Sequence, residues 1–109
     1  MPTNSFKNAG VQVGTSRTTL FTCPSGKECI VHALYLSNVD GTSSADVDIE
    51  VTVDGGSTYR YVGKTLPVPA DSTLVLDKPL NLEASDILAV TASAASDIEA
   101  YCAVLEITP

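Results

Sequence analysis

One histidine and three cysteines are the residues of this sequence best able to do chemistry. Zn²⁺ prefers such ligands, which stand here at Cys23, Cys29, His32 and Cys102. The spacing of the first three matches no familiar zinc knuckle, and a strand would place residues 29 and 32 on opposite faces. A lone histidine also lacks the partners that orient a catalytic imidazole. We therefore predict no metal and no cofactor, with His32 packed in the core or at an interface.

The cysteines are odd in number, and no apolar export signal precedes them. A disulfide between Cys23 and Cys29 across the turn at 24–28 is geometrically possible. Free thiols are the default for a chain that stays where it is made. We expect Cys29 and Cys102 to act as small core residues.

A row of carboxylates is a second candidate site. Asp46, Asp48 and Glu50 alternate with apolar residues, so a strand aligns them on one face. Oxygen ligands at this spacing could hold Ca²⁺, but the run lacks the glycine turn of a dedicated calcium loop. We favour a solvated face whose like charges discourage association between sheets.

Two tyrosines form a third candidate site. Tyr59 and Tyr61 share one face of a short strand, with Arg60 on the other face. Such a pair could stack on sugar rings, or pack across strands or between subunits. The sequence has no tryptophan, which makes a sugar-binding module the weaker interpretation.

The strand that carries the carboxylates has the clearest pattern in the chain. Residues 45–54 alternate apolar and polar without error, which is typical of a half-buried strand. We expect Val47, Ile49 and Val51 to be buried. The turn at 54–57 contains two glycines and predicts an antiparallel hairpin with 58–64.

The remaining apolar runs predict further short strands and no convincing helix. The expected strands are 10–14, 18–22, 29–38, 72–76, 80–83, 87–93 and 98–108, with 66–70 as an extended crossover because each proline removes a ladder donor. The run 29–38 is apolar on both faces, so it is either a central strand covered on both sides or an interface strand. The spacing predicts an all-β fold: a single-domain antiparallel β-sandwich, jelly-roll-like, of about eight strands. Residues 10–109 form this domain, and the polar residues 1–9 form an N-terminal arm.

Charge and composition limit the possible partners. The formal net charge of −7 argues against nucleic acid and anionic membranes. Residues 1–27 carry three cations and no acid, whereas the rest carries three cations against thirteen acids. No serine lies in a nucleophile-elbow pattern, and a jelly-roll enzyme of the cupin type would need several histidines. We predict a protein that is not an enzyme.

Several segments together resemble small virion structural proteins of tailed bacteriophages, particularly marine and cyanobacterial ones. The segments are TTLFTCPSGK at 18–27, VHALYLSN at 31–38, DGG at 54–56, LVLDKPLNLE at 74–83 and VLEI at 104–107. The sequence departs from the pattern at Ser85, where the family has glycine before Asp86. The resemblance implies a non-enzymatic part of the virion: a capsid cement or decoration protein, or a head–tail, collar or tail component.

The resemblance also implies assembly. We expect a homo-oligomer, most simply a trimer, bound to the major capsid protein or another virion protein after assembly in the host cytoplasm. The alternative is a neck, tail or fibre component, or an adhesin-type module that binds glycans. The expected interface residues are Phe6, Lys7, Arg17, His32, Tyr59 and Tyr61. Phe6 is the one large apolar group of the arm and its natural anchor.

Overall fold

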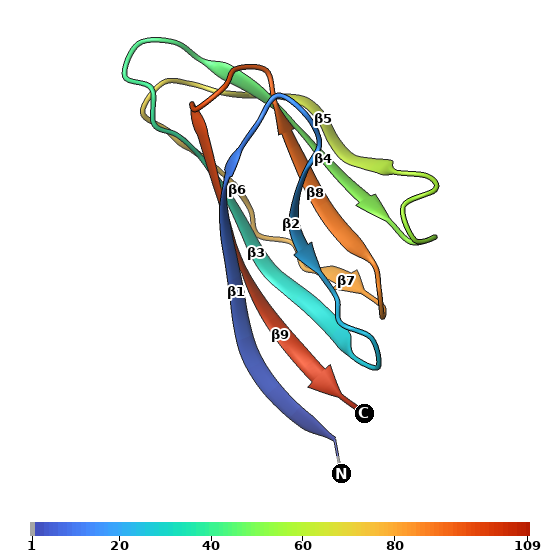
Figure 1. Ribbon diagram of the computed structural model, residues 1–109. Coiled ribbons are helices and arrows are strands. Elements are labelled where there is room, and N and C mark those ends of the chain that lie inside the picture. The colour runs from blue at the N-terminus through green and yellow to red at the C-terminus, as the bar shows by residue number, and fades with distance from the viewer. Residues whose placement is uncertain (1) are drawn as a thin grey trace.

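The structure, a computed structural model, describes residues 2–109 as nine strands in two antiparallel sheets (Figure 1). The strands are β1 (Thr3–Val13), β2 (Thr18–Thr22), β3 (Glu28–Asn38), β4 (Ala45–Thr52), β5 (Arg60–Val68), β6 (Thr73–Leu76), β7 (Leu80–Leu82), β8 (Ile87–Ala92) and β9 (Ile98–Thr108). The residues described include no helix, and so none that could cross a membrane.

The first sheet has the strand order β1-β9-β3-β6, and β7 also pairs with β3. The second sheet has the order β2-β8-β4-β5. Each sheet thus takes strands from both halves of the chain, as two facing Greek keys do in a jelly roll. The prediction of an all-β, jelly-roll-like sandwich is confirmed.

The core fills the space between the sheets with small aliphatic side chains and thiols. Each strand contributes alternate residues, because successive side chains point to opposite faces. The largest fully buried side chains are Leu34, Leu36, Ile49, Leu82, Leu88, Ile98, Val13, Val31, Val47, Val68, Val90 and Val104. No aromatic ring is among them, which suits two closely packed sheets.

Strand β1 begins seven residues earlier than the sequence pattern predicts. It pairs with β9 without interruption, from Thr3 opposite Thr108 to Val13 opposite Ile98. Residues 3–9, which sequence analysis separates as an arm, therefore have a strand partner within their own chain. Their polar composition hides the strand because nearly all of these side chains are exposed.

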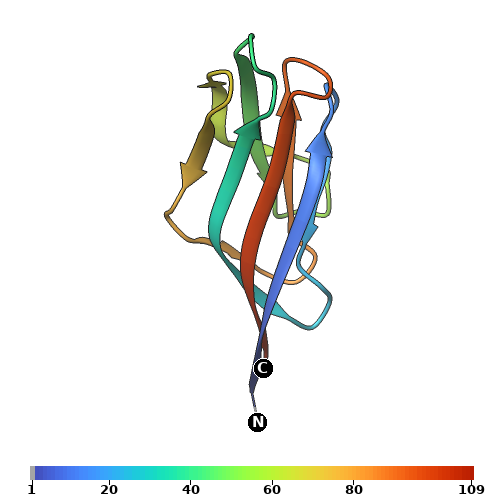
Figure 2. The same cartoon turned by 90° about the vertical axis from the view of Figure 1, so that its left-hand side faces the viewer.

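The first sheet is longer than the second at the end where the termini lie. Figures 1 and 2 show β1 and β9 running on past the strands of the second sheet, with both termini at that tip. The molecule is accordingly elongated, measuring 50 × 28 × 19 Å. The tip presents β1 as an open edge of the first sheet.

The β4–β5 hairpin is confirmed, with two corrections. Residues 66–68 are not a crossover but the end of β5, where Pro67 is tolerated because β5 is an edge strand. Val51, expected in the core, is only partly buried, whereas Val47 and Ile49 are fully buried. The register of β5 shifts on either side of Ile49, and Thr65 within it has φ of 54°.

Candidate functional site

Apolar side chains cover much of the outer face of the first sheet, on the side away from the core. Phe6 lies opposite Leu105, which lies opposite Ile30. In a second row, Tyr101 lies opposite Tyr35, which lies opposite Val75. We call these two rows the apolar face; its residues are Phe6, Ile30, Tyr35, Val75, Tyr101 and Leu105.

Four residues of the apolar face are well exposed. Phe6 is 83% exposed, and Tyr35, Val75 and Tyr101 are each between 39% and 47% exposed. Contiguous exposed apolar side chains are uncommon on soluble monomers and mark interaction sites when they gather. The rings of Tyr35 and Tyr101 pack against each other with their centroids 6.1 Å apart, so this part of the face is already ordered.

An open hollow of about 400 Å³ lies beside the tyrosine pair. Gly10, Tyr35 and Tyr101 are among the residues that line it. Gly10 lies opposite Tyr101 on the outer face of the edge strand, where any other residue would place a side chain. The absence of a side chain at Gly10 therefore leaves this side of the hollow open.

A β-bulge brings His32 to the same surface. The β3–β9 register shifts between Val31 and Ala33, which leaves His32 as the extra residue. His32 is exposed, and its ring centroid is 6.3 Å from that of Phe6. His32 is thus a surface residue. Of the two alternatives for residues 29–38, the strand covered on both faces is wrong, since the outer face of β3 is open within this chain, and the interface strand stays a prediction.

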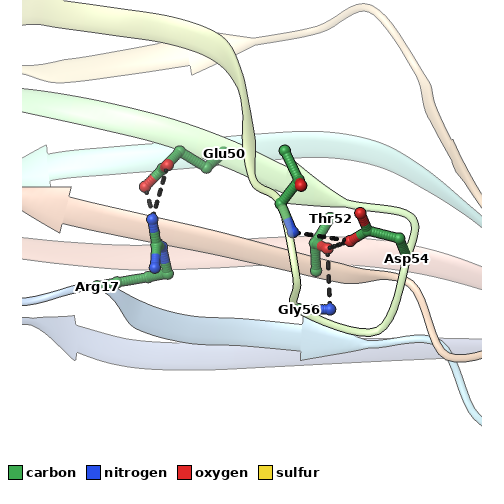
Figure 3. A network of polar contacts seen from close by, with 6 residues as sticks. Arg17, Glu50, Thr52, Asp54 and Gly56 are labelled. Carbon is green, nitrogen blue, oxygen red and sulfur yellow. Dashed lines mark hydrogen bonds and ion pairs between the residues drawn. The ribbon is translucent and has the colours of Figure 1, made fainter.

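On the opposite side of the molecule, Arg17 binds across the outer face of the second sheet. Its Nε and Nη2 donate to the two carboxylate oxygens of Glu50 at 3.3 and 3.1 Å (Figure 3). Its guanidinium carbon lies 3.8 Å from the ring centroid of Tyr59. The hydrogen bond to Glu50 raises the pKa of Arg17 above its ordinary value. Glu50, expected on a solvated face, is only 6% exposed because this cluster covers it.

The hairpin turn beside this cluster is held by side chains (Figure 3). Thr52 Oγ1 and the Thr58 N–H both donate to Asp54 Oδ1, at 2.8 and 2.9 Å. The Gly56 N–H donates to Thr52 Oγ1 at 3.0 Å. The bond from the Thr58 backbone lowers the pKa of Asp54. Asp48 accepts from the Thr65 N–H at 2.7 Å, so three of the acids at 46–54 hold local structure.

The three thiols are free and buried. The sulfurs of Cys23 and Cys29 are 3.0 Å apart, across the turn that joins β2 to β3. Burial, followed by the hydrogen bond to Cys23, raises the pKa of Cys29 to about 12, and burial raises that of Cys102 to about 11. No cluster that could hold a metal is found among residues 2–109, and His32 lies on the outer face.

The raised thiol pKa values predict a loss of stability in alkali. Above about pH 8.5 the unfolded chain releases these protons while the folded chain keeps them, so rising pH favours unfolding. For Cys102 this loss amounts to at most about 1.4 kcal/mol per pH unit between pH 8.5 and its folded pKa of about 11. Melting curves of the wild type and of Cys102→Ala between pH 8 and 10.5 should show a steeper decline for the wild type. Equal slopes would contradict the pKa assigned to Cys102.

The predicted interface residues fall into two groups and one single residue. Phe6 and His32 lie together on the outer face of the first sheet, while Arg17 contacts Tyr59 on the outer face of the second. Tyr61 lies opposite Glu50 on that second face and is 53% exposed. Lys7 is exposed on the other side of β1 from Phe6.

Sequence reasoning named only Phe6 of the apolar face as an interface residue. It reached Ile30 and Tyr35 only through the alternative that 29–38 is an interface strand, and it missed Val75, Tyr101 and Leu105. A signal was present in β9, where Tyr101, Ala103, Leu105 and Ile107 occupy the positions that alternate with the core residues. When a strand is apolar on both faces and one face packs against the core, its other apolar face is left for a partner to cover.

No protein-family model and no curated protein matches this sequence. Among solved structures, a chain of the acidic stable capsid structure of Helicobacter pylori bacteriophage KHP30 is 16% identical, with a TM-score of 0.58 over 100% of this chain and 94% of that one. A chain of the Bacillus endospore appendages, described as disulfide-linked pili, is 15% identical, with a TM-score of 0.57 over 98% and 88%.

A chain of the T13 particle of infectious bursal disease virus is 10% identical, with a TM-score of 0.58; the match spans 97% of this chain but only 30% of that one. Identities this low establish likeness of fold alone. The chain therefore has a jelly-roll sandwich whose architecture is shared by chains of viral capsids and of a Bacillus endospore appendage.

Proposed function

We propose that this protein is a non-enzymatic virion structural protein, and that it serves as a capsid cement or decoration protein of a tailed bacteriophage. The observation that carries the proposal is the exposed apolar face, on a fold shared with a chain of a bacteriophage capsid. The resemblance of segments 18–27, 31–38 and 74–83 to phage virion proteins supports the same conclusion.

The apolar face has the properties of a docking surface. Its side chains stand on three neighbouring strands, β1, β9 and β3, together with β6, so a rigid sheet fixes their positions. Aromatic residues supply much of the exposed area, as they do in the centres of protein interfaces. The net charge of −7 keeps the free protein soluble despite this face. We propose that the major capsid protein covers it in the particle.

Two alternative functions are tested by the same measurements on purified virus particles. A neck, tail or fibre component would use the same face but would be present in a dozen copies or fewer, whereas a cement protein is present in hundreds. An adhesin that stacks sugars on Tyr59 and Tyr61 has less support, because the guanidinium of Arg17 already covers the ring of Tyr59.

The test measures copy number and binding to heads assembled without this protein. Tyr35→Ser with Val75→Ser removes two exposed side chains of the apolar face, and Val53→Ser is the matched control because Val53 is 72% exposed beside the hairpin turn. We expect the double variant to melt like the wild type and to bind at least about tenfold more weakly, since hot-spot side chains dominate interface energy. The control should bind like the wild type.

Quantitative mass spectrometry of purified particles should give hundreds of copies per head. Unchanged binding of the double variant would overturn the assignment of the docking face. A copy number of a dozen or fewer would overturn the cement role in favour of a neck or tail role, and absence from the particle would overturn the virion role.

A further inference from the structure

The two sheets have four edge regions, and three of them are poor templates for pairing with another strand. β2 is only five residues long. β5 contains Pro67 and two shifts of register. β6 and β7 have four and three residues and are separated by a break that includes Pro79. Short strands, bulges and prolines are the devices by which proteins keep sheet edges from pairing.

The fourth edge, β1, has none of these devices. It runs for 11 residues without a proline, and its register with β9 is unbroken. Within residues 2–109 it pairs only with β9, so its other side presents backbone donors and acceptors over residues 3–12, up to the fully buried Val13. Lys7 is its only charged residue. Such an edge is a template for pairing with an extended strand.

We propose that β1 pairs with β1 of a second copy of this chain, antiparallel, about a two-fold axis at Asn8. Asn8 is the midpoint of β1, and this register pairs residues 4–12 of both copies. Across the axis the pairs are Asn4 with Gln12, Ser5 with Val11, Phe6 with Gly10, Lys7 with Ala9, and Asn8 with Asn8. The two first sheets then form one continuous sheet.

The side chains of β1 are self-complementary in this register. Phe6 and Gly10 both lie on the outer face, and the two-fold axis keeps them on the same face of the joined sheet. The ring of Phe6, 83% exposed in one copy, lies against Gly10 of the second copy, beside the hollow that Gly10 and Tyr101 line there. An aromatic ring across from a strand glycine covers the backbone that the glycine exposes.

Neighbouring registers are less favourable. An axis at Lys7 places the two ammonium groups directly opposite each other and moves Phe6 away from Gly10. An axis between two residues pairs side chains from opposite faces of the sheet. An axis at Phe6 pairs only residues 3–9. These differences favour a second copy in one register over a partner of unrelated sequence.

The pairing goes beyond the proposed function and does not depend on it, because the isolated protein can be tested in solution. Sedimentation equilibrium of the full chain should show a monomer–dimer equilibrium. Phe6→Ala and Gly10→Leu should each raise the dimer dissociation constant at least about tenfold, since each removes the contact between Phe6 and Gly10 twice in every dimer. Val53→Ala, which removes another exposed apolar side chain, should leave it unchanged.

Gly10→Leu is a suitable probe because the monomer can accept it. A Cβ at Gly10 would lie 3.6 Å from the Ala100 carbonyl oxygen and 3.9 Å from Tyr101 Cδ1, which are ordinary contacts. The new side chain would occupy the place of the partner's Phe6. Melting temperatures measured on each variant at a concentration where it is monomeric confirm that a lost dimer is not a lost fold.

The axis at Asn8 has its own test. Asn8→Asp and Asn8→Lys alone each place like charges opposite each other and should weaken the dimer about threefold, whereas an equimolar mixture should form the mixed dimer preferentially. A wild type that stays monomeric to millimolar concentration would overturn the proposal. The proposal would be overturned in the same way if β1 of that monomer bound a different protein. A dimer that ignores Phe6→Ala and Gly10→Leu would also overturn it, and equal behaviour of the single and mixed Asn8 variants would overturn the register.

Discussion

Ile49→Asp is expected to abolish the native fold, whereas Val53→Asp leaves the melting temperature unchanged. Ile49 is fully buried at the centre of the sandwich, where β4 lies between β8 and β5. The substitution removes about 1.5–3 kcal/mol of apolar burial and places a carboxylate without a partner in the core. The sum is comparable to the whole stability of a small domain, about 5–15 kcal/mol.

Circular dichroism and thermal melting of a graded series test this expectation. Val51→Asp should fall between the two extremes, because Val51 is partly buried near the end of the strand. Val53 lies just beyond β4 and is 72% exposed, which makes it the matched control. A native, cooperatively melting Ile49→Asp protein would show that the wrong face of β4 has been assigned to the core.

The strands of this fold were predictable where their side chains alternate sharply. Residues 45–54 follow the period of two, and the structure has β4 there. β1 was missed over residues 3–9 because most of its side chains face solvent on both sides of the sheet, so no alternation marks it. Residues 66–68 were misjudged because a proline excludes a central strand but not an edge strand, and position in the sheet depends on distant segments.

Local pattern indicates that β3 and β9 are apolar on both faces, but it does not say which strands lie beside them in the sheet. The two rows of the apolar face exist because β9 lies between β1 and β3. The sequence of residues 98–108 does not predict which strands are its neighbours. Tyr35 and Tyr101 are 66 positions apart in the chain yet directly opposite in the sheet. The role of Gly10 depends on its pairing with Tyr101, because Gly10 has no side chain to fill the hollow beside that ring.

The cluster of Arg17, Glu50 and Tyr59 shows how such distant contacts change the role of a residue. Sequence analysis places Glu50 in a row of solvated carboxylates and Arg17 among the expected interface residues. In the structure the two side chains bind each other, 33 positions apart in the chain. The pair holds the segment before β2 against the outer face of β4, so we expect it to stabilise the fold.

Arg17→Ala is therefore expected to lower the melting temperature more than the double substitution of Arg17 and Glu50 by alanine. The single change leaves without a partner the Glu50 carboxylate, which is only 6% exposed when Arg17 is in place and remains partly covered by the surrounding sheet. A buried polar group left unpaired costs about 1–3 kcal/mol, which corresponds to a fall of about 5–15 °C in a domain of this size. The double variant removes the stranded carboxylate together with its partner, so part of the loss is recovered.

A double-mutant cycle of Arg17→Ala, Glu50→Ala and the pair measures this coupling by thermal or urea unfolding. Arg60→Ala is the matched control, because Arg60 is an exposed arginine of β5. Additive losses in the cycle would contradict the argument, since they would mean that Glu50 finds water as readily as it finds Arg17. A non-additive cycle with an unaffected control assigns the stability to the pair itself, because the cycle subtracts what each side chain does alone.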